Sequence, residues 1–149
     1  MQIKRRIESV ANASNLKPLQ VLQNRILKTI TFSHRHHSTN DLHSKLRVLK
    51  IRDVHVFKMG TFTYKYVNNT LPRVFCNIVN PRMLSYPMNC TRSNALFSVT
   101  RHNTKHGKLL LNNYCFKMWN ALPNEVKISK SYVTFKKKLK AFLIGNYSA

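Results

Sequence analysis

A proline that ends one helix, and the lysine-rich amphipathic segment after it, constrain the fold of this chain more than any other stretch. Helical periodicity runs to Trp119, the only tryptophan, and stops at Leu122-Pro123 because proline drives the residue before it out of the α region. Ser131 is suited to cap the next helix, whose apolar residues recur at steps of three and four: Phe135, Leu139, Phe142 and Leu143. We therefore expect a turn at Pro123 and burial of the second helix against Trp119.

Lysines lie on the other side of this C-terminal helix. On a helical wheel, Lys136, Lys137 and Lys140 fall outside the apolar stripe. Their ammonium groups can stay in water while the seam is buried. These three residues are candidate contacts to a nucleic acid.

A second clear helix is predicted in the N-terminal half. Pro18 suits its first turn, and its apolar stripe consists of Leu19, Leu22, Ile26, Leu27 and Ile30. We expect the opposite face to meet solvent or a polyanion. Its side chains are suited to phosphate and sugar oxygens, and the candidate contacts are Gln20, Gln23, Asn24, Arg25 and Lys28, with Lys17 beside them. An ordinary solvated face is the plainer alternative. Arg92, in a predicted loop, completes the candidate set.

Shorter elements complete a mainly α chain. Helical patterns are expected over 41–46 and 53–66, with one turn within 72–80. Segment 95–100 alternates like a strand, and 109–111 is a suitable partner for it. The predicted fold is a small helical domain of about four to five helices that also allows a short β-hairpin. Residues 1–12 are expected to be frayed or disordered, and 13–149 to form the domain.

Charge narrows the class of partner. The chain has 26 lysines and arginines against four acids, a net charge of +22, which suggests that a polyanion normally neutralises it. The cations are spread along the chain, which favours nucleic acid over a membrane surface. No run is long enough for a membrane span, the first residues do not resemble a signal peptide, and three scattered cysteines give no disulfide framework. We expect an intracellular protein, in the nucleus or cytoplasm.

Patterns for catalysis and metal binding are weak. The four acids are far apart, without the Asp-Asp or Asp-x-Asp that clusters carboxylates around divalent metals, and no motif singles out a nucleophile and base. We expect no catalysis by this chain alone, no cofactor, no metal and no small-molecule substrate. A zinc-dependent domain is an alternative, because four histidines cluster in the sequence: His34, His36, His37 and His43. It is the weaker one, because their spacing has little of the pattern that zinc ligands usually show.

Several separated stretches resemble one known family in the same order. They are Ala13-Ser14-Asn15-Leu16-Lys17-Pro18 with the helix after it, Leu46-Arg47-Val48-Leu49-Lys50-Ile51, Tyr64-Lys65-Tyr66-Val67-Asn68-Asn69-Thr70-Leu71-Pro72, Cys90-Thr91-Arg92-Ser93, and Trp119-Asn120-Ala121-Leu122-Pro123 followed by Phe135-Lys136-Lys137-Lys138-Leu139-Lys140. Together they resemble the thumb and post-thumb tail of reverse transcriptases from non-LTR retrotransposons of the LINE type, jockey-like elements in particular.

The resemblance implies a fragment of an RNA-directed DNA polymerase, made of a thumb-like helix and a post-thumb helical domain. In such a fragment the helix at 19–30 would lie along the minor groove of the template-primer duplex, an RNA or RNA-DNA duplex. The metal-binding Tyr-x-Asp-Asp palm motif and the endonuclease of the family have no match here, so neither activity is carried over. The missing palm is an implied partner. The start at Met1 fits a truncated genomic copy, and a remnant without function is an alternative.

The aromatic residues allow two interpretations. Tyr64, Tyr66, Tyr114 and Trp119 lie beside lysines and are suited to stacking on bases, although packing in the core is favoured for Trp119. Alternatively, the chain is a basic protein-interaction module that docks on a polymerase core through Phe57, Tyr64 and the Trp119 region.

Overall fold

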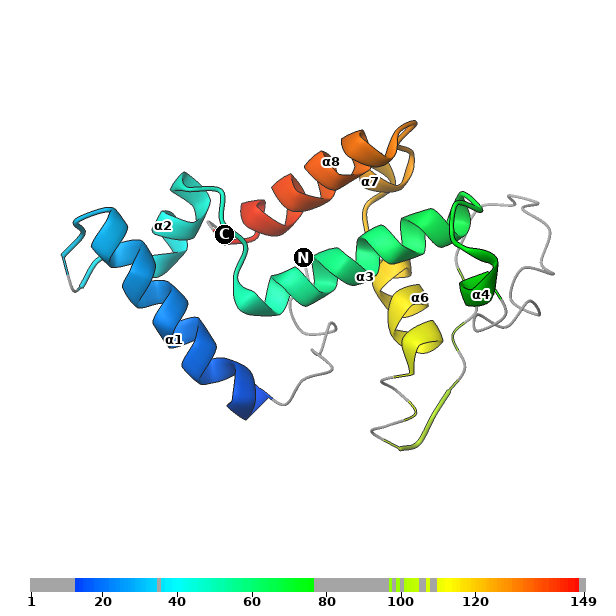
Figure 1. Cartoon of the computed structure of the whole chain (residues 1–149), viewed down its shortest axis with the longest axis horizontal. Coiled ribbons are helices and arrows are strands. Elements are labelled where there is room, and N and C mark those ends of the chain that lie inside the picture. The colour runs from blue at the N-terminus through cyan, green and yellow to red at the C-terminus, as the bar shows by residue number, and fades with distance from the viewer. Residues whose placement is uncertain are drawn as a thin grey trace.

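The computed structural model describes residues 13–34, 36–76, 97, 99, 101–104, 107 and 110–147. Its helices in chain order are α1 (Ala13–Ile30), α2 (Thr39–Lys45), α3 (Ile51–Val67), α4 (Arg73–Cys76), α6 (Leu111–Ala121), α7 (Asn124–Lys127) and α8 (Tyr132–Gly145) (Figure 1). The predicted mainly α fold is confirmed. The helices expected over 41–46, 53–66 and 72–80 are α2, α3 and α4, whereas residues 1–12 lie outside the described ranges.

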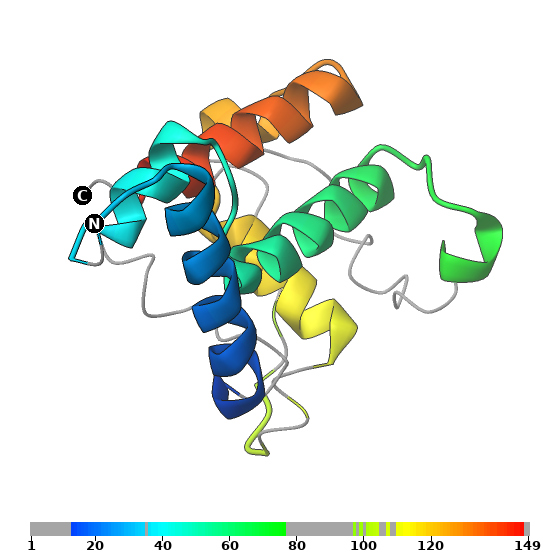
Figure 2. The same ribbon diagram turned by 60° about the vertical axis from the view of Figure 1, so that its left-hand side comes forward.

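Helix α3 is the central element on which the others pack. It contacts α6, α8 and α1. Figures 1 and 2 show α1 and α2 near the start of α3, with α6 and α8 along its length. The core between α3, α6, α7 and α8 is a cluster of buried side chains: Val56, Tyr64, Met118, Trp119, Leu122, Val126, Phe135, Leu139 and Leu143.

The turn predicted at Pro123 is confirmed. Helix α6 ends at Ala121, and the short helix α7 follows Pro123, a turn that the sequence pattern did not indicate. The indole of Trp119 is buried, with its ring stacked on Phe135 at a centroid distance of 5.9 Å. The Ser131 hydroxyl accepts a 3.3 Å hydrogen bond from the Val133 N–H, so the predicted cap of α8 is also confirmed.

Gly60 has a packing reason to stand in the middle of α3. A glycine in a helix interior costs about 1 kcal/mol relative to alanine. A Cβ built at Gly60 would lie 2.6 Å from Leu139 Cδ2 on α8, closer than packed carbon atoms approach. The missing side chain therefore lets α3 and α8 come close together at this point.

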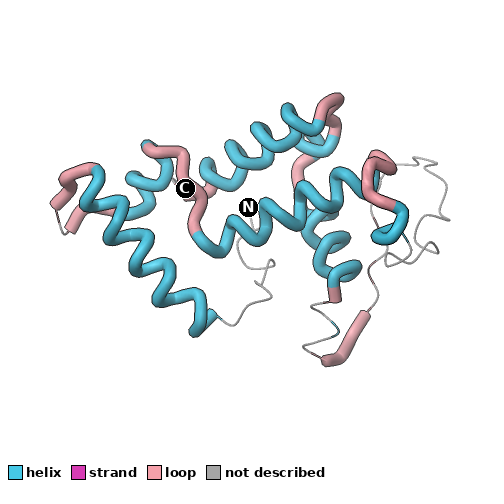
Figure 3. The backbone as a smooth tube through the Cα atoms, viewed as in Figure 1, coloured by secondary structure: helices cyan, strands magenta, loops and turns pink. Residues whose placement is uncertain are grey.

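Most of the expected β-hairpin lies outside the described residues, because 95, 96, 98, 100 and 109 are not among them; the described residues contain no strand (Figure 3). The side-chain amide of Asn120 bonds to both backbone groups of Phe97: the Phe97 N–H donates to Asn120 Oδ1 at 2.9 Å, and Asn120 Nδ2 donates to the Phe97 carbonyl at 2.8 Å. The Phe97 ring stacks on Phe116 at 4.4 Å. Leu111, expected to pair as a strand residue, is instead the first residue of α6.

Candidate nucleic-acid interface

Helix α8 presents an array of lysines to solvent. Its inner residues Phe135 and Leu139 are fully buried against α3 and α6. Because side chains three and four positions apart share a helix face, the residues between them point outward. Lys136, Lys137 and Lys140, here called the α8 lysine face, are all exposed, as the sequence predicted. The helix contains no acidic residue, so its outer surface carries charge of one sign.

Tyr132 joins this face to α3. The ammonium group of Lys136 lies 5.3 Å from the centre of the half-buried Tyr132 ring, and that of Lys65 on α3 lies 4.9 Å from it. The negative face of an aromatic ring attracts a cation and offsets part of the repulsion between neighbouring cations. The positive surface therefore extends from α8 to the C-terminal part of α3.

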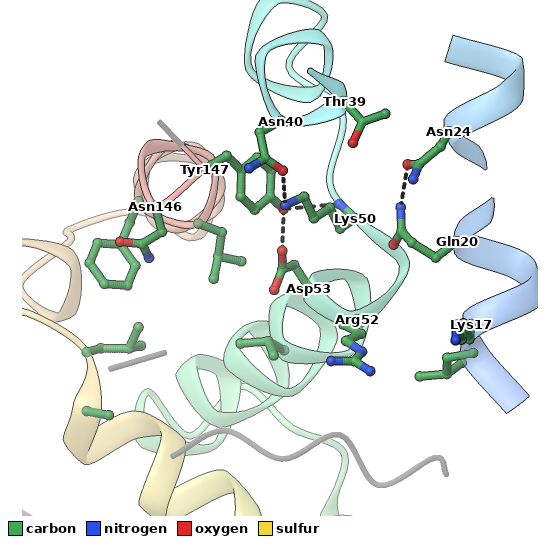
Figure 4. Close-up of a pocket in the computed structure, with 16 residues that line it drawn as sticks. Lys17, Gln20, Asn24, Thr39, Asn40, Lys50, Arg52, Asp53, Asn146 and Tyr147 are labelled. Atoms are coloured by element: carbon green, nitrogen blue, oxygen red, sulfur yellow. Dashed lines mark hydrogen bonds between the residues drawn. The ribbon is translucent and has the colours of Figure 1, made fainter. Parts of the chain in front are cut away.

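A cavity of about 470 Å³ lies where α1, α2, α3 and the C-terminal end of α8 meet (Figure 4). Its floor is apolar and includes Val56, Leu122, Phe142 and Leu143. Polar and charged side chains from several elements line the rest: Lys17, Gln20, Asn24, Thr39, Asn40, Lys50, Arg52, Asp53, Asn146 and Tyr147. Lys17 and Arg52 are exposed, so the mouth of the cavity is cationic.

Inside the cavity, Tyr147 holds the start of α3. Its hydroxyl accepts a 3.0 Å hydrogen bond from the Lys50 N–H and donates a hydrogen bond to the carboxylate of Asp53. Burial, and secondarily the bond to Asp53, raises the pKa of Tyr147. The Lys50 ammonium donates to Asn40 Oδ1 at 2.7 Å and lies 4.3 Å from the centre of the Tyr147 ring (Figure 4). Most of the polar groups deep in this cavity thus serve the fold.

The predicted orientation of α1 is wrong for most of its apolar stripe and for its amide side chains. Most of the stripe is exposed, whereas the amides of the opposite face bond to α2 and to the segment before α3. Gln20 Oε1 accepts from the Ile51 N–H at 3.0 Å, and Gln23 Nε2 donates to the Leu49 carbonyl at 2.8 Å. Asn24 Oδ1 lies 3.2 Å from Nε2 of the buried His43. Three of the predicted nucleic-acid contacts, Gln20, Gln23 and Asn24, therefore have structural partners.

Of the remaining predicted contacts outside α8, two lie on α1 and one falls outside the described residues. Arg25 is exposed on α1 and Lys28 is half-buried there. Arg92 lies outside the described residues. Sequence reasoning missed Arg52, and it considered Lys65 only as a neighbour of Tyr64 and Tyr66. The tertiary fold brings Lys65 beside α8 and Arg52 to the mouth of the cavity.

The aromatic residues proposed for base stacking or for docking belong to the core. Tyr64, Tyr66, Tyr114 and Trp119 are all buried, and Phe57 is half-buried against the same cluster. The Tyr64 hydroxyl donates to the Ser129 carbonyl at 2.7 Å. The side chains of Tyr64 and Trp119 are therefore not accessible to a polymerase core in this structure.

The histidines do not form a metal centre in the part of the chain that is described. His34, His36 and His37 are exposed, whereas His43 is buried with Nδ1 at 3.0 Å from the Val48 carbonyl. Within the described ranges no three residues of the metal-binding types lie close enough to hold an ion. Burial lowers the pKa of His43.

None of the described helices combines the length and the apolar character needed to cross a bilayer. Comparisons of the chain with protein families, with curated proteins and with solved structures found no match.

Proposed function

We propose that this chain binds the phosphate backbone of a nucleic-acid duplex through the α8 lysine face. The observation that carries the proposal is the coupling of those lysines to the core. Phe135 and Leu139 anchor α8, so Lys136, Lys137 and Lys140 project from a rigid support and not from a loose tail. Side chains held on a regular element lose less freedom on binding than side chains on a flexible segment.

The spacing of the lysines suits neighbouring phosphates. Lys136 and Lys140 are four residues apart, a rise of about 6 Å along a helix. Phosphates of one strand follow at intervals of about 3.4 Å along a duplex axis. Ammonium groups on flexible four-carbon stems can therefore reach successive phosphates. Contacts to phosphates position a duplex without reading its bases, so the binding is indifferent to sequence.

The resemblance to reverse-transcriptase tails favours an RNA-DNA or RNA duplex as the ligand. In this proposal the chain supports the duplex and performs no chemistry of its own. Lys17 and Arg52 at the mouth of the cavity are suited to hold one further phosphate. A polymerase palm would be the second partner of such a fragment.

Fluorescence anisotropy with labelled duplexes at increasing salt concentrations tests the proposal. A variant that carries Lys136→Gln, Lys137→Gln and Lys140→Gln should bind more weakly. Its slope of log K against log salt should be flatter by about 0.9 for each lost contact. The matched control neutralises three exposed lysines on other helices, Lys45, Lys58 and Lys117, and removes the same charge.

The two variants distinguish a binding face from bulk charge. Equal losses in both would show that net charge alone attracts the duplex, and the assignment to α8 would fail. Parallel titrations with an RNA-DNA hybrid, an RNA duplex and a DNA duplex of one sequence test the ligand class. Tighter binding of the DNA duplex would contradict the part of the proposal that rests on the resemblance.

A further inference from the structure

Helix α1 carries a row of exposed apolar side chains. Leu19, Leu22, Ile26 and Ile30, here called the α1 seam, are between 49% and 63% exposed. Phe32, just beyond the helix, is 97% exposed. Single exposed apolar residues are ordinary on a protein surface, but a contiguous row marks an interaction site.

The exposure is fixed by the fold. Rotating α1 to bury the seam would withdraw Gln20 and Gln23 from the backbone groups of Ile51 and Leu49. Those backbone groups would then be left without these partners, which destabilises the rotated arrangement. Leu27, on the inward side of the helix, already supplies the apolar contact of α1 with the domain. The seam therefore stays on the surface.

The seam has the shape of a helix-docking site. Its members follow one another at steps of three, four and four, and the row is about 17 Å long at 1.5 Å per residue. Such a narrow stripe matches the contact line of two packed helices. A helix adsorbed on lipid instead presents a broad apolar face and turns its polar face to the head groups. The polar face of α1 is bonded to the rest of the domain.

Charge selects the kind of helix. Two copies of this chain would bring +22 against +22, which opposes self-association through α1. The exposed Arg25 lies three residues after Leu22 and directly before Ile26, at the edge of the seam. We propose that the α1 seam docks an acidic amphipathic helix of a partner protein, with leucine-like side chains on the seam and carboxylates beside Arg25.

The test uses the full chain and two synthetic peptides of about 21 residues, three heptads with leucine at the inner positions. One peptide has glutamate at the flanking positions and the other has lysine. Fluorescence anisotropy at physiological salt should show binding of the glutamate peptide only. The Leu22→Gln, Ile26→Gln variant should lose on the order of tenfold in affinity. The Arg25→Glu variant should also bind the glutamate peptide more weakly.

Control variants distinguish binding at the α1 seam from general electrostatic attraction of an acidic peptide. The Ile128→Gln, Val133→Gln variant changes two exposed apolar residues elsewhere and should bind the glutamate peptide like the unaltered chain. Unchanged affinity in the Leu22→Gln, Ile26→Gln variant would overturn the proposal. If the unaltered chain sediments with vesicles containing phosphatidylserine and the Leu22→Gln, Ile26→Gln variant does not, the seam binds lipid instead. Concentration-dependent dimers lost in that variant would assign it to self-association.

Discussion

Gln20 Oε1 accepts a hydrogen bond from the backbone N–H of Ile51 at 3.0 Å, although 31 positions separate the two residues. Ile51 begins α3, and the first N–H groups of a helix have no partner within it. The residue before it, Lys50, makes no side-chain cap. A glutamine of α1 thus provides the cap that the local sequence of α3 lacks.

Because of this hydrogen bond, we expect that replacing a polar residue of α1 destabilises the protein more than replacing an apolar one, the reverse of the usual order. Gln20→Ala should lower the free energy of unfolding by about 1–2 kcal/mol, because it removes the cap. Leu22→Ala should change it by no more than about 0.5 kcal/mol, because Leu22 faces solvent. Urea unfolding of both variants measures the two effects. A larger loss for Leu22→Ala would mean that the inward face of α1 has been assigned incorrectly.

The core contacts of α8 predict a large effect at Phe135. Its ring stacks on Tyr64 at 4.3 Å and on Trp119 at 5.9 Å, and it is fully buried. Phe135→Ala should cost about 3–5 kcal/mol, through lost transfer energy and the cavity left behind. Val133→Ala on the same helix is the control, since Val133 is 58% exposed. Chemical denaturation measures both stabilities. Near-equal stabilities of the two variants would contradict the packing of α8 described above.

Acid should destabilise the domain through His43. Burial, followed by the nearby Lys50, lowers the pKa of His43 in the folded state, while the unfolded chain has the ordinary value of about 6.5. On acidification the unfolded state then binds the proton first. The contribution of His43 to the free energy of unfolding is therefore complete above pH 6.5 and is lost as the pH falls. The loss is at most about 1.4 kcal/mol for the first pH unit below 6.5.

Unfolding of the unaltered chain and of His43→Gln between pH 7.5 and 5.5 checks this expectation. The variant should show a shallower dependence on pH, whatever its absolute stability. His55 contributes with the same sign, because burial lowers its pKa as well, so some dependence should remain. Identical slopes in the two proteins would remove His43 as the acid-sensitive group.

Tyr147→Phe should loosen the start of α3. The change removes a hydroxyl that accepts from the Lys50 N–H and donates to Asp53. We expect a loss of about 1–3 kcal/mol, because a charged acceptor is deprived of its donor. Hydrogen exchange at the first amides of α3 should accelerate more than exchange in α6. Uniform acceleration would show a global effect instead of a local one.

The C-terminal half was the more predictable part of the fold. Trp119, Pro123 and Ser131 act through local rules of helix ending and capping, so they indicated α6, the turn and α8 correctly. The exposure of Lys136, Lys137 and Lys140 follows from the same periodicity.

The N-terminal half depends on contacts that local patterns do not contain. Periodicity placed Leu22 inside and Gln20 outside, because it does not register that the backbone at Ile51 needs an acceptor. The environment of Phe97 also depends on a distant residue, since the side-chain amide of Asn120 satisfies its backbone groups. Both hydrogen bonds join residues more than twenty positions apart.

The hydrogen bond between Tyr147 and Lys50 can form only late in protein synthesis. The two residues are 97 positions apart, so at about 5–20 residues per second the ribosome adds Tyr147 roughly 5 to 20 s after Lys50. For most of that interval α3 has been made, but α8, which covers its apolar side, has not. The nascent chain therefore exposes α3 while it waits, and chaperones that recognise apolar helices would meet it before its own C-terminal helix does.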